Sequence, residues 1–253
     1  MPGLTTSLTT NFFKIQKNLI FTMEIALVDR RNYLRLIFSY MIRIDPSDWL
    51  DGVFANSNID FDLLRYPVSN YEILAAFEKD KVRQTQIFKG EVIRILGSHD
   101  AFYLVMKFDR TIGWVDADSV NILKKVCDFI APTSAGINAD DFLREWIGVE
   151  YLFGGISKKG IDCSGFTQKY SLDVLGRVIP KNSRDQRNIG QPKDLKNIQF
   201  NDLAFCHRKG SDLHHVVLYF KNRFWHARPK YGVVSQSPDD FYELFEVESV
   251  ATL

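Results

Sequence analysis

One cysteine of this chain stands where its thiol could act as a nucleophile. Cys163 precedes a segment in which Phe166, Tyr170 and Val174 recur at helical spacing, so we expect it at the N-terminus of a helix. The helix dipole and the free backbone N–H groups there stabilise an anion, which predicts a lowered pKa for the thiol and its selective alkylation at about pH 6. The same N–H groups can hold the oxyanion that forms when a thiolate attacks a carbonyl.

A thiolate nucleophile needs a base, and two histidines are spaced for that role. Residues 213–220 have the pattern of a strand, residues 221–222 that of a tight turn, and residues 223–227 that of the returning strand. Across such a hairpin, His215 and His226 can touch. One imidazole could then act on the thiol while the other fixes its tautomer, as the third member of a catalytic triad does.

The remaining histidines and cysteines are expected to be structural. We expect His214 on the opposite strand face from His215, and His207 on a solvated loop. Cys127 and Cys206 are expected to be buried, as free cysteines usually are. The chain lacks the close Cys-x-x-Cys or His-x-x-x-His spacing of a zinc site, so we expect neither a metal nor a cofactor.

The composition excludes several classes of protein. Of the 253 residues, 45% are apolar and 25% charged, which is typical of a globular chain with a packed core. Three cysteines cannot all pair within one chain, so a disulfide-stapled scaffold is excluded. A net charge of +1 lacks the basic excess of proteins that bind nucleic acid through phosphates, and we expect no such partner.

The first 50 residues contain two apolar runs, at 19–28 and 34–44. Charges interrupt both runs, including Glu24 and Arg35, and neither reaches the roughly 18 residues of a membrane-spanning helix. We therefore expect helices that pack on the body of the protein and no stable membrane insertion. The alternatives are a cryptic signal peptide and a start of translation at Met23.

The next stretch predicts a small β-barrel. Residues 45–78 carry turn signals and little periodicity, whereas short alternating strands separated by turns follow from Gln84 to Val115. On one of these strands we expect a shared face made of Phe102, Leu104, Met106 and Phe108. Small residues and a proline at 131–136 predict a linker. The expected domains are an N-terminal helical segment (1–50), a barrel (51–130) and a C-terminal domain (131–253).

Motifs within the predicted barrel resemble a bacterial SH3-like domain. They are Thr85-Gln86, Gly90-Glu91 and Ile112-Gly113-Trp114-Val115. The resemblance covers about 40 residues, and the Gly-Tyr pair that usually precedes the Gly-Trp pair is missing. It implies a domain that binds cell-wall glycopeptide or shapes a neighbouring active site. The alternative is an inert barrel, and for Trp114 itself we expect a packing role.

The C-terminal half opens with an expected helix. Asn138 can cap it, and acidic residues follow in its first turn, where the helix dipole favours negative charge. Its apolar stripe is expected to comprise Phe142, Leu143, Trp146 and Ile147, with Gly148 at its end.

Residues 138–247 then resemble, motif by motif, the NlpC-type cell-wall cysteine peptidases. The matching motifs are Tyr151-x-Phe153-Gly154-Gly155, Asp162-Cys163-Ser164-Gly165-Phe166, Ile179-Pro180-Lys181, Ser183-Arg184-Asp185-Gln186, Asp202-Leu203-Ala204-Phe205, His215-Val216-Val217-Leu218-Tyr219 and Trp225-His226-Ala227. Their order and spacing make the resemblance specific. It implies an α+β fold in which an SH3-like barrel precedes a papain-like domain, whose cysteine-bearing helix packs on an antiparallel sheet that bears the histidine.

The resemblance also implies a role for each matching site residue. Cys163 would be the nucleophile, His215 the base and His226 the third polar member, with Tyr151 beside the thiol at the oxyanion site. The chain departs from the family where Val217 stands in place of a small residue, and where Asn201 replaces a glycine, a change that asparagine tolerates because it accepts a positive φ.

The implied reaction is hydrolysis of the bond between D-γ-glutamate and a diamino acid such as diaminopimelate, in peptidoglycan stem peptides with a free N-terminal L-alanine. For the substrate's amine the candidate is Asp162, and for its α-carboxylate it is Arg184. Ser164 and Asp185 are further candidates for substrate binding.

Two other functions remain open at this point. One is a cell-wall-binding protein that has lost turnover, although the cysteine and both histidines are present. The other is a thiol acyltransferase on the same fold. A mechanism that needs a reduced thiol favours the cytoplasm, with the periplasm or secretion as the alternative.

Overall fold

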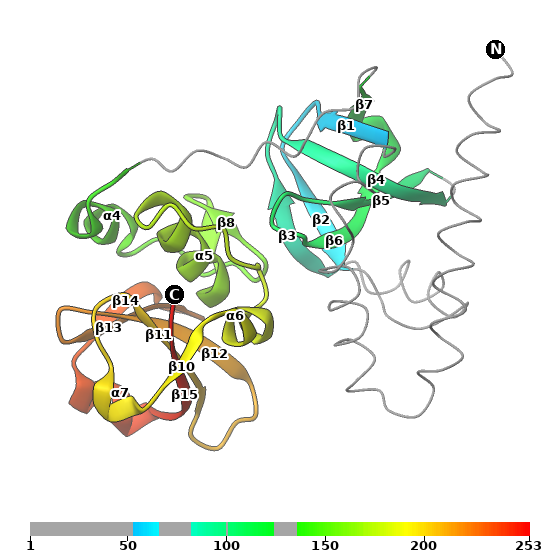
Figure 1. Ribbon diagram of the computed structural model, residues 1–253. Coiled ribbons are helices and arrows are strands. Elements are labelled where there is room, and N and C mark those ends of the chain that lie inside the picture. The colour runs from blue at the N-terminus through cyan, green and yellow to red at the C-terminus, as the bar shows by residue number, and fades with distance from the viewer. Residues whose placement is uncertain (1–52, 66–81, 100, 124–135) are drawn as a thin grey trace, which may run out of the picture. The chain divides into compact units, whose positions relative to one another are not determined.

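The computed structural model describes residues 53–65, 82–99, 101–123 and 136–253. They belong to two compact units (Figure 1): the first comprises residues 53–65, 82, 88–99, 101–107 and 112–123, and the second comprises residues 83–87, 108–111 and 136–253. The helical segment expected at residues 1–50 lies outside the described residues, as do Cys127 and almost all of the expected linker.

A seven-stranded sheet has the order β3-β2-β6-β5-β4-β1-β7, and all of its strands except β3 belong to the N-terminal unit. The elements in this region are β1 (Val53–Ser57), β2 (Phe61–Arg65), β3 (Arg83–Ile87), β4 (Val92–His99), β5 (Phe102–Met106), β6 (Ile112–Asp116), the 3-10 helix η2 (Ala117–Ser119) and β7 (Val120–Ile122). The first two strands lie within the expected barrel domain (51–130), in the part where the sequence shows turn signals and little periodicity. Each has five residues and pairs with strands far along the chain, so the local sequence carries little of their signal.

The strands predicted between Gln84 and Val115 are present with shifted ends. Trp114 is buried, as expected of a packing residue. Of the residues expected to share one face, Phe102, Leu104 and Met106 lie on β5, whereas Phe108 follows the end of the strand. The irregularity in the register between β4 and β5 lies on β4, between Ile95 and Gly97.

The C-terminal unit has helices on both faces of a six-stranded antiparallel sheet with the order β10-β15-β11-β12-β13-β14 (Figure 1). Its elements are α4 (Ala139–Trp146), β8 (Ile156–Ser157), β9 (Gly160–Ile161), α5 (Cys163–Asp173), α6 (Ser183–Ile189), β10 (Gln191–Lys193), the 3-10 helix η3 (Leu195–Asn197), β11 (Asp202–Arg208), β12 (His214–Phe220), β13 (Arg223–Arg228), β14 (Gly232–Gln236), α7 (Pro238–Leu244) and β15 (Phe245–Thr252). This mixture of helices and antiparallel strands confirms the α+β class for this unit.

Alternating side chains on the central strand divide the core into two layers. On β11, Leu203 and Phe205 pack with the buried residues of α4 and α5, whereas Ala204 and Cys206 pack with those of α7. The helix that begins at Cys163 therefore covers one face of the sheet, and α7 covers the other.

Helix α4 begins as predicted and ends earlier than predicted. The Asn138 side chain accepts a hydrogen bond of 2.9 Å from the backbone N–H of Asp140. The stripe residues of α4 are buried, but Ile147 is 52% exposed. Its inclusion in the stripe was wrong, because the helix ends at Trp146 and the backbone then turns Ile147 outward.

The hairpin predicted around the two histidines is present. Lys221 and Asn222 both have positive φ, 50° and 56°, which is the geometry of a two-residue type I′ turn between β12 and β13. Asn201 adopts a φ of 72°, as expected for an asparagine in place of a glycine. His207, however, lies within β11 and not on a loop, because pairing with β15 continues β11 as far as Arg208.

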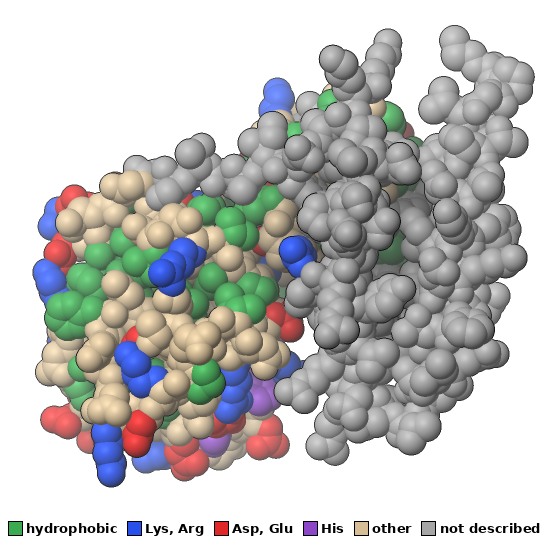
Figure 2. All heavy atoms as spheres, viewed as in Figure 1, with side chains coloured by type: hydrophobic (Ala, Val, Ile, Leu, Met, Phe, Trp, Pro, Cys, Tyr) green, Lys and Arg blue, Asp and Glu red, His purple; other side chains and the backbone are tan. Residues whose placement is uncertain are grey.

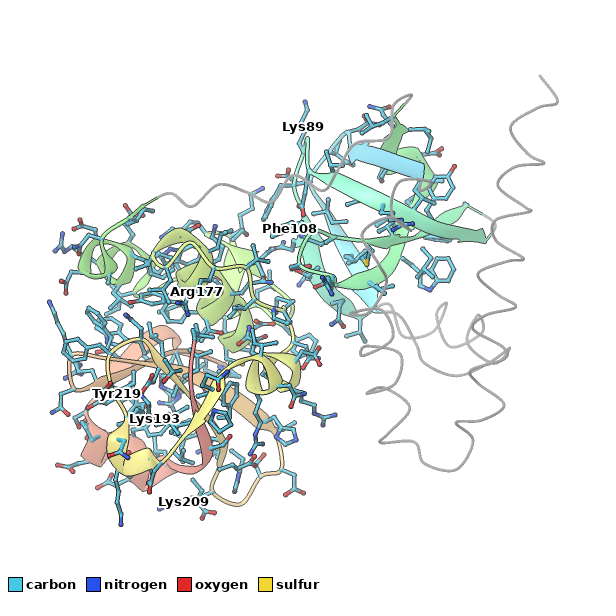
Figure 3. The ribbon with its side chains drawn as sticks, in the orientation of Figure 1. Lys89, Phe108, Arg177, Lys193, Lys209 and Tyr219 are labelled. Atoms are coloured by element: carbon cyan, nitrogen blue, oxygen red, sulfur yellow. The ribbon has the colours of Figure 1, made fainter. Side chains whose placement is uncertain are left out.

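Charged groups on the C-terminal unit are of mixed sign. Figure 2 shows lysines and arginines interspersed with acidic side chains over the visible face of this unit. One ion pair joins two strands of the sheet: Lys193 on β10, labelled in Figure 3, donates to the buried Asp202 carboxylate of β11 at 2.7 Å. Within the described ranges, no helix combines the length and the apolar character needed to cross a membrane.

Candidate active site

The thiol of Cys163 lies between the start of α5 and strand β12. Cys163 is the first residue of α5, and the preceding Asp162 is its N-cap. The backbone N–H groups of Ser164 and Val216 both donate hydrogen bonds toward the sulfur. Because the N–H of Val216 belongs to the peptide that joins it to His215, the thiol lies directly against the main chain of the candidate base.

The pKa of the Cys163 thiol is raised to about 11, the opposite of the lowered value expected from the helix dipole. Burial is the largest cause, and the neighbouring Asp162 carboxylate adds to it. The N–H groups that face the sulfur and the Lys181 ammonium act in the other direction without outweighing these causes. The predicted position at a helix start is therefore confirmed, but the resting nucleophile is a thiol.

Three side chains on adjacent strands form one hydrogen-bonded row. His215 Nε2 on β12 lies 2.6 Å from His226 Nδ1 on β13, and His226 Nε2 lies 2.8 Å from Gln236 Oε1 on β14. His226 is fully buried, and the ring of His215 stacks on Phe245 with 5.4 Å between centroids. The predicted contact between the two histidines is confirmed.

Both imidazoles of this row are neutral at physiological pH. Burial, with the Arg228 guanidinium as the second cause, lowers the pKa of His215 to about 4. Burial and the neighbouring His215 hold the pKa of His226 well below its usual range. A neutral imidazole has a free lone pair, so it can accept a proton from a thiol or from water.

The two histidines meet where strands β12 and β13 part. These strands pair only from Leu218 to Phe220, opposite Trp225 to Arg223. His215 lies before the paired residues of β12, and His226 after those of β13. Their side chains therefore meet beyond the end of the ladder, beside the peptide that contacts the thiol.

Tyr151 is close enough to the thiol for their charges to interact. Burial is the main cause that raises the pKa of Tyr151, and Cys163 and Asp162 raise it further. Its phenol therefore stays protonated and can donate a hydrogen bond. The main chain of Tyr151 pairs with Ile161, next to the start of α5.

The carboxylate of Asp162, which was expected to bind the substrate's amine, is hydrogen-bonded to groups of the protein itself. Its buried carboxylate accepts hydrogen bonds from Lys181 Nζ at 2.7 and 2.8 Å, from the Gly154 N–H at 2.7 Å, from the Gly165 N–H at 2.6 Å and from Ser164 Oγ at 3.1 Å. Lys181 and Ser164 are buried with it. Lys181 thus neutralises this carboxylate in the resting protein, and the roles of Asp162 and Ser164 in substrate binding stay predictions.

Comparison with known proteins identifies the family. A sequence model described as the NlpC/P60 family matches residues 148–243. The "Probable endopeptidase NlpC" of Escherichia coli K12 is 34% identical over 110 residues, which make up 43% of this chain and 70% of that protein. The chain belongs to the NlpC/P60 family.

Other NlpC/P60 relatives differ in the activity that their names give. The "Murein DD-endopeptidase MepS/Murein LD-carboxypeptidase" of Escherichia coli K12 is 37% identical over 103 residues, 40% of this chain and 54% of that protein. The "Gamma-D-glutamyl-L-lysine dipeptidyl-peptidase" of Bacillus cereus is 27% identical over 168 residues, 64% of this chain and 48% of that protein. The chain thus spans about half the length of each of these two relatives.

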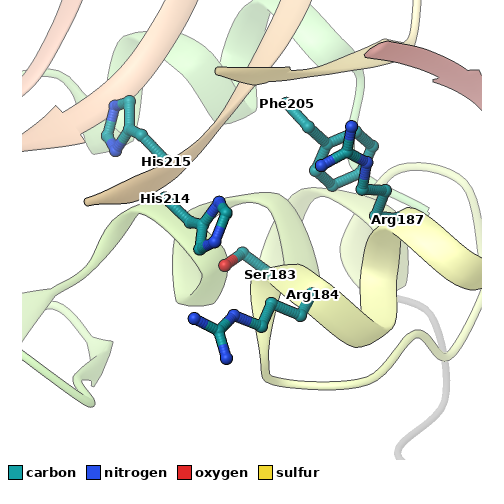
Figure 4. Close-up of a pocket in the computed structure, with 6 residues that line it drawn as sticks. All are labelled: Ser183, Arg184, Arg187, Phe205, His214 and His215. Carbon is teal, nitrogen blue, oxygen red and sulfur yellow. The ribbon is translucent and has the colours of Figure 1, made fainter. Parts of the chain in front are cut away.

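A small pocket of this NlpC/P60 domain lies beside His215. It is lined by Ser183, Arg184, Arg187, Phe205, His214 and His215 (Figure 4). His214 and His215 extend from opposite sides of β12, as predicted, and both arginines come from α6. Arg187 is paired with Glu248 at 2.5 Å, whereas Arg184 is exposed.

Asp185, the remaining candidate for substrate binding, is half-buried on α6 next to this pocket. Burial raises its pKa to about 6, although the Arg184 guanidinium acts to lower it.

Two residues of the NlpC/P60 site escaped sequence reasoning. Lys181 lies in a matching motif, but nothing local indicates that its ammonium is buried against Asp162. Gln236 is joined to the site only through the pairing of β13 with β14, which no motif signals. Among the described residues, no group of three or more His, Cys, Asp or Glu side chains is arranged to hold a metal ion.

The buried ion pair predicts a large loss of stability when one partner is removed. Lys181→Met leaves the Asp162 carboxylate buried without a counter-ion, so urea unfolding is expected to show a free energy lower by about 3 to 5 kcal/mol. The matched control is Lys221→Met, which breaks an exposed pair with Asp140 and is expected to cost less than about 1 kcal/mol. Equal losses in the two variants would contradict a structural role for the buried pair.

The raised pKa predicts slow alkylation of the resting thiol near neutrality. The rate of carboxamidomethylation of Cys163, followed by peptide mass spectrometry, is expected to climb without a plateau from about pH 6 to about pH 9.5, because the thiolate fraction grows throughout this range. Cys163→Ser reports the background from the other two cysteines. A fast plateau already reached at about pH 6 would contradict the raised pKa and restore the expectation of a thiolate.

Proposed function

We propose that this chain is a cysteine endopeptidase that hydrolyses the bond between γ-D-glutamate and a diamino acid in peptidoglycan stem peptides. The observation that carries the proposal is the contact of the Cys163 thiol with the peptide before Val216, beside the hydrogen-bonded pair of His215 and His226. These residues supply the three groups that the reaction needs: a nucleophile, a neutral base and a group that orients the base.

In the first step the base and the nucleophile act together. His215 Nδ1 takes the thiol proton while the Cys163 sulfur attacks the amide carbonyl, because a thiol with a raised pKa gains nucleophilicity only as it loses its proton. The carbonyl oxygen becomes an oxyanion within reach of backbone N–H groups at the start of α5 and of the Tyr151 hydroxyl. The C–N bond then breaks, and the imidazolium returns the proton to the leaving amine.

In the second step water releases the acyl group. His215 takes a proton from a water molecule that attacks the thioester carbonyl. The C–S bond breaks, the peptide leaves as a carboxylic acid and the sulfur regains its proton. A thiol acyltransferase would pass the acyl group to an amine instead, so adding a primary amine and looking for an amide product distinguishes the two reactions.

The choice of bond rests on the family resemblance and on a relative. The Bacillus cereus relative is named for a γ-D-glutamyl-L-lysine bond and for the release of dipeptides. We assign this chain the same class of bond, with a free L-alanine at the substrate's N-terminus and with diaminopimelate as one possible diamino acid. In this proposal the N-terminal strands form an SH3-like domain that restricts the substrate, and the reaction takes place in the cytoplasm, where thiols stay reduced.

A different peptide bond is the second candidate for cleavage. It is favoured by the 37% identity of this chain to the murein DD-endopeptidase over the aligned residues. In that case the substrate would be a cross-linked murein peptide. The two bonds require different peptides, so one assay with both substrates separates the candidates.

The pocket beside His215 suits the α-carboxylate of D-glutamate. Arg184 is an exposed guanidinium on α6 that faces this pocket, and a guanidinium binds a carboxylate through two parallel hydrogen bonds. Burial raises the pKa of the neighbouring Asp185 to about 6, so its carboxyl could donate a hydrogen bond to the same carboxylate only below that pH. Arg184 is therefore the residue that we assign to the γ-glutamyl linkage.

Replacement of the nucleophile is expected to abolish hydrolysis. Cys163→Ala should show no turnover of L-Ala-γ-D-Glu-diaminopimelate above background by chromatography of the products, while its urea unfolding midpoint stays at that of the unchanged chain. Cys206→Ala is the control for loss of a different thiol. Normal turnover by Cys163→Ala would contradict the cysteine-peptidase mechanism.

Substrate variants test the choice of bond with the unchanged chain. N-acetylation of the tripeptide should block cleavage, because the free amine is part of what is recognised. Equal cleavage of the acetylated tripeptide, or of a cross-linked murein peptide in preference to the tripeptide, would contradict this specificity and leave the broader function standing.

Arg184→Ala is expected to weaken binding and not chemistry. KM for the tripeptide should rise about tenfold with kcat little changed, because one charge-assisted hydrogen-bonded pair is lost. A substrate with a carboxamide in place of the α-carboxylate should be hydrolysed equally well by the variant and the unchanged chain. Arg144→Ala, an exposed arginine on α4, is the matched control. An unchanged preference for the carboxylate would contradict the assignment.

A further inference from the structure

We propose that Gln236 is a positioning residue. It determines which ring nitrogens of His226 and His215 carry a proton, and it leaves His215 Nδ1 free to act as the base. The inference rests on the proposed function for its kinetic consequence. Its structural part concerns the resting protein and stands on the geometry of β12, β13 and β14.

The orientation of the Gln236 amide follows from its neighbours. Arg228 Nη1 lies 3.4 Å from Gln236 Oε1, and a guanidinium can only donate, so the atom that faces it must be the amide oxygen. The amide nitrogen lies 3.4 Å from the carbonyl oxygen of Asp240, which can only accept. Both contacts are long, and both require the same orientation of the amide.

The amide oxygen then fixes the tautomer of His226. Gln236 Oε1 accepts a hydrogen bond from His226 Nε2 at 2.8 Å, so this nitrogen carries the proton. A neutral imidazole has one N–H group, so Nδ1 of His226 has a bare lone pair.

The lone pair of His226 Nδ1 in turn fixes the tautomer of His215. His226 Nδ1 lies 2.6 Å from His215 Nε2 and can only accept, so the proton between them belongs to His215 Nε2. Nδ1 of His215 is then bare. It is also the ring nitrogen nearer the main chain, on which the Cys163 thiol lies. One amide dipole on β14 thus determines which nitrogen of His215 can take the thiol proton.

The reverse arrangement would disable the base. With a donor in place of Gln236 Oε1, His226 would carry its proton on Nδ1, and His215 Nε2 would accept a hydrogen bond from it. The proton of His215 would then lie on Nδ1, which would have no lone pair with which to take the proton of the thiol. A wrong tautomer of the base is severely damaging in hydrolases of this kind.

The surroundings keep the imidazoles of His215 and His226 neutral, so each ring carries a single N–H group. The charged groups that act on the two histidines are Arg228 on β13, which disfavours the imidazolium of both, and Asp162, which favours that of His215. The other groups packed on His226 are the rings of Phe241 and Phe245, which carry no charge.

The direct test reads the protons in the resting protein. Long-range ¹H–¹⁵N spectra of ¹⁵N-labelled full chain should show protonated Nε2 and bare Nδ1 in both His215 and His226. In Gln236→Leu the signal of the reversed tautomer should appear in both rings together. Protonated Nδ1 in the unchanged chain, or identical spectra for the variant, would overturn the inference whatever the activity.

Kinetics provide the second test. Gln236→Leu should lower kcat for the tripeptide by about 10- to 100-fold with KM unchanged. Gln236→Glu keeps the acceptor, so it should recover most of kcat at high pH. Its negative charge stabilises the imidazolium, raises the pKa of the base and moves the acid limb of the kcat/KM profile to higher pH.

The matched control is Gln191→Leu, an exposed glutamine on β10, the opposite edge strand of the same sheet. It should leave kcat, KM and the acid limb unchanged. Equal losses in Gln236→Leu and Gln191→Leu, or no recovery with Gln236→Glu, would overturn the positioning role. If the unchanged chain does not cleave the tripeptide, the proposed function fails, and the spectra still decide the inference.

Discussion

The buried ion pair between Asp162 and Lys181 is the interaction on which the rest of the site depends. The Asp162 carboxylate caps α5, accepts a hydrogen bond from the Gly154 N–H in the loop before the helix and neutralises the buried ammonium of Lys181. The shared carboxylate therefore joins the first turn of α5 to the loop before it. The thiol of Cys163 lies in that turn, where the Val216 N–H of β12 donates to the sulfur.

The electrostatics of the site follow from burial more than from the helix dipole. Burial raises the pKa of the thiol and lowers that of His215, so both groups rest in their neutral forms. In the proposed reaction the proton therefore moves as the sulfur attacks, and the imidazolium exists only while the acyl group is transferred. A row of neutral hydrogen bonds from His215 to Gln236 suits this timing, since it orients the base without charging it beforehand.

Local sequence patterns were sufficient for the parts of the site that depend on local interactions. The helix start at Cys163, the cap at Asn138 and the two-residue turn that brings His215 to His226 follow from side chains within a few positions of one another. Strands β1 and β2, the burial of Lys181 and the role of Gln236 depend on partners far along the chain. The sign of the thiol pKa shift was missed because burial, its largest cause, depends on the packing of α5 against elements far along the chain.

In the proposed reaction the Cys163 sulfur forms a thioester with the γ-glutamyl carbonyl. This intermediate can be trapped by rapid acid quenching of the unchanged chain with L-Ala-γ-D-Glu-diaminopimelate, followed by intact and peptide mass spectrometry. We expect a transient L-Ala-D-Glu adduct on the peptide that contains Cys163, formed as diaminopimelate is released and lost as the dipeptide appears. Cleavage of the tripeptide with no adduct at any time, or with an adduct on another residue, would contradict the proposed reaction.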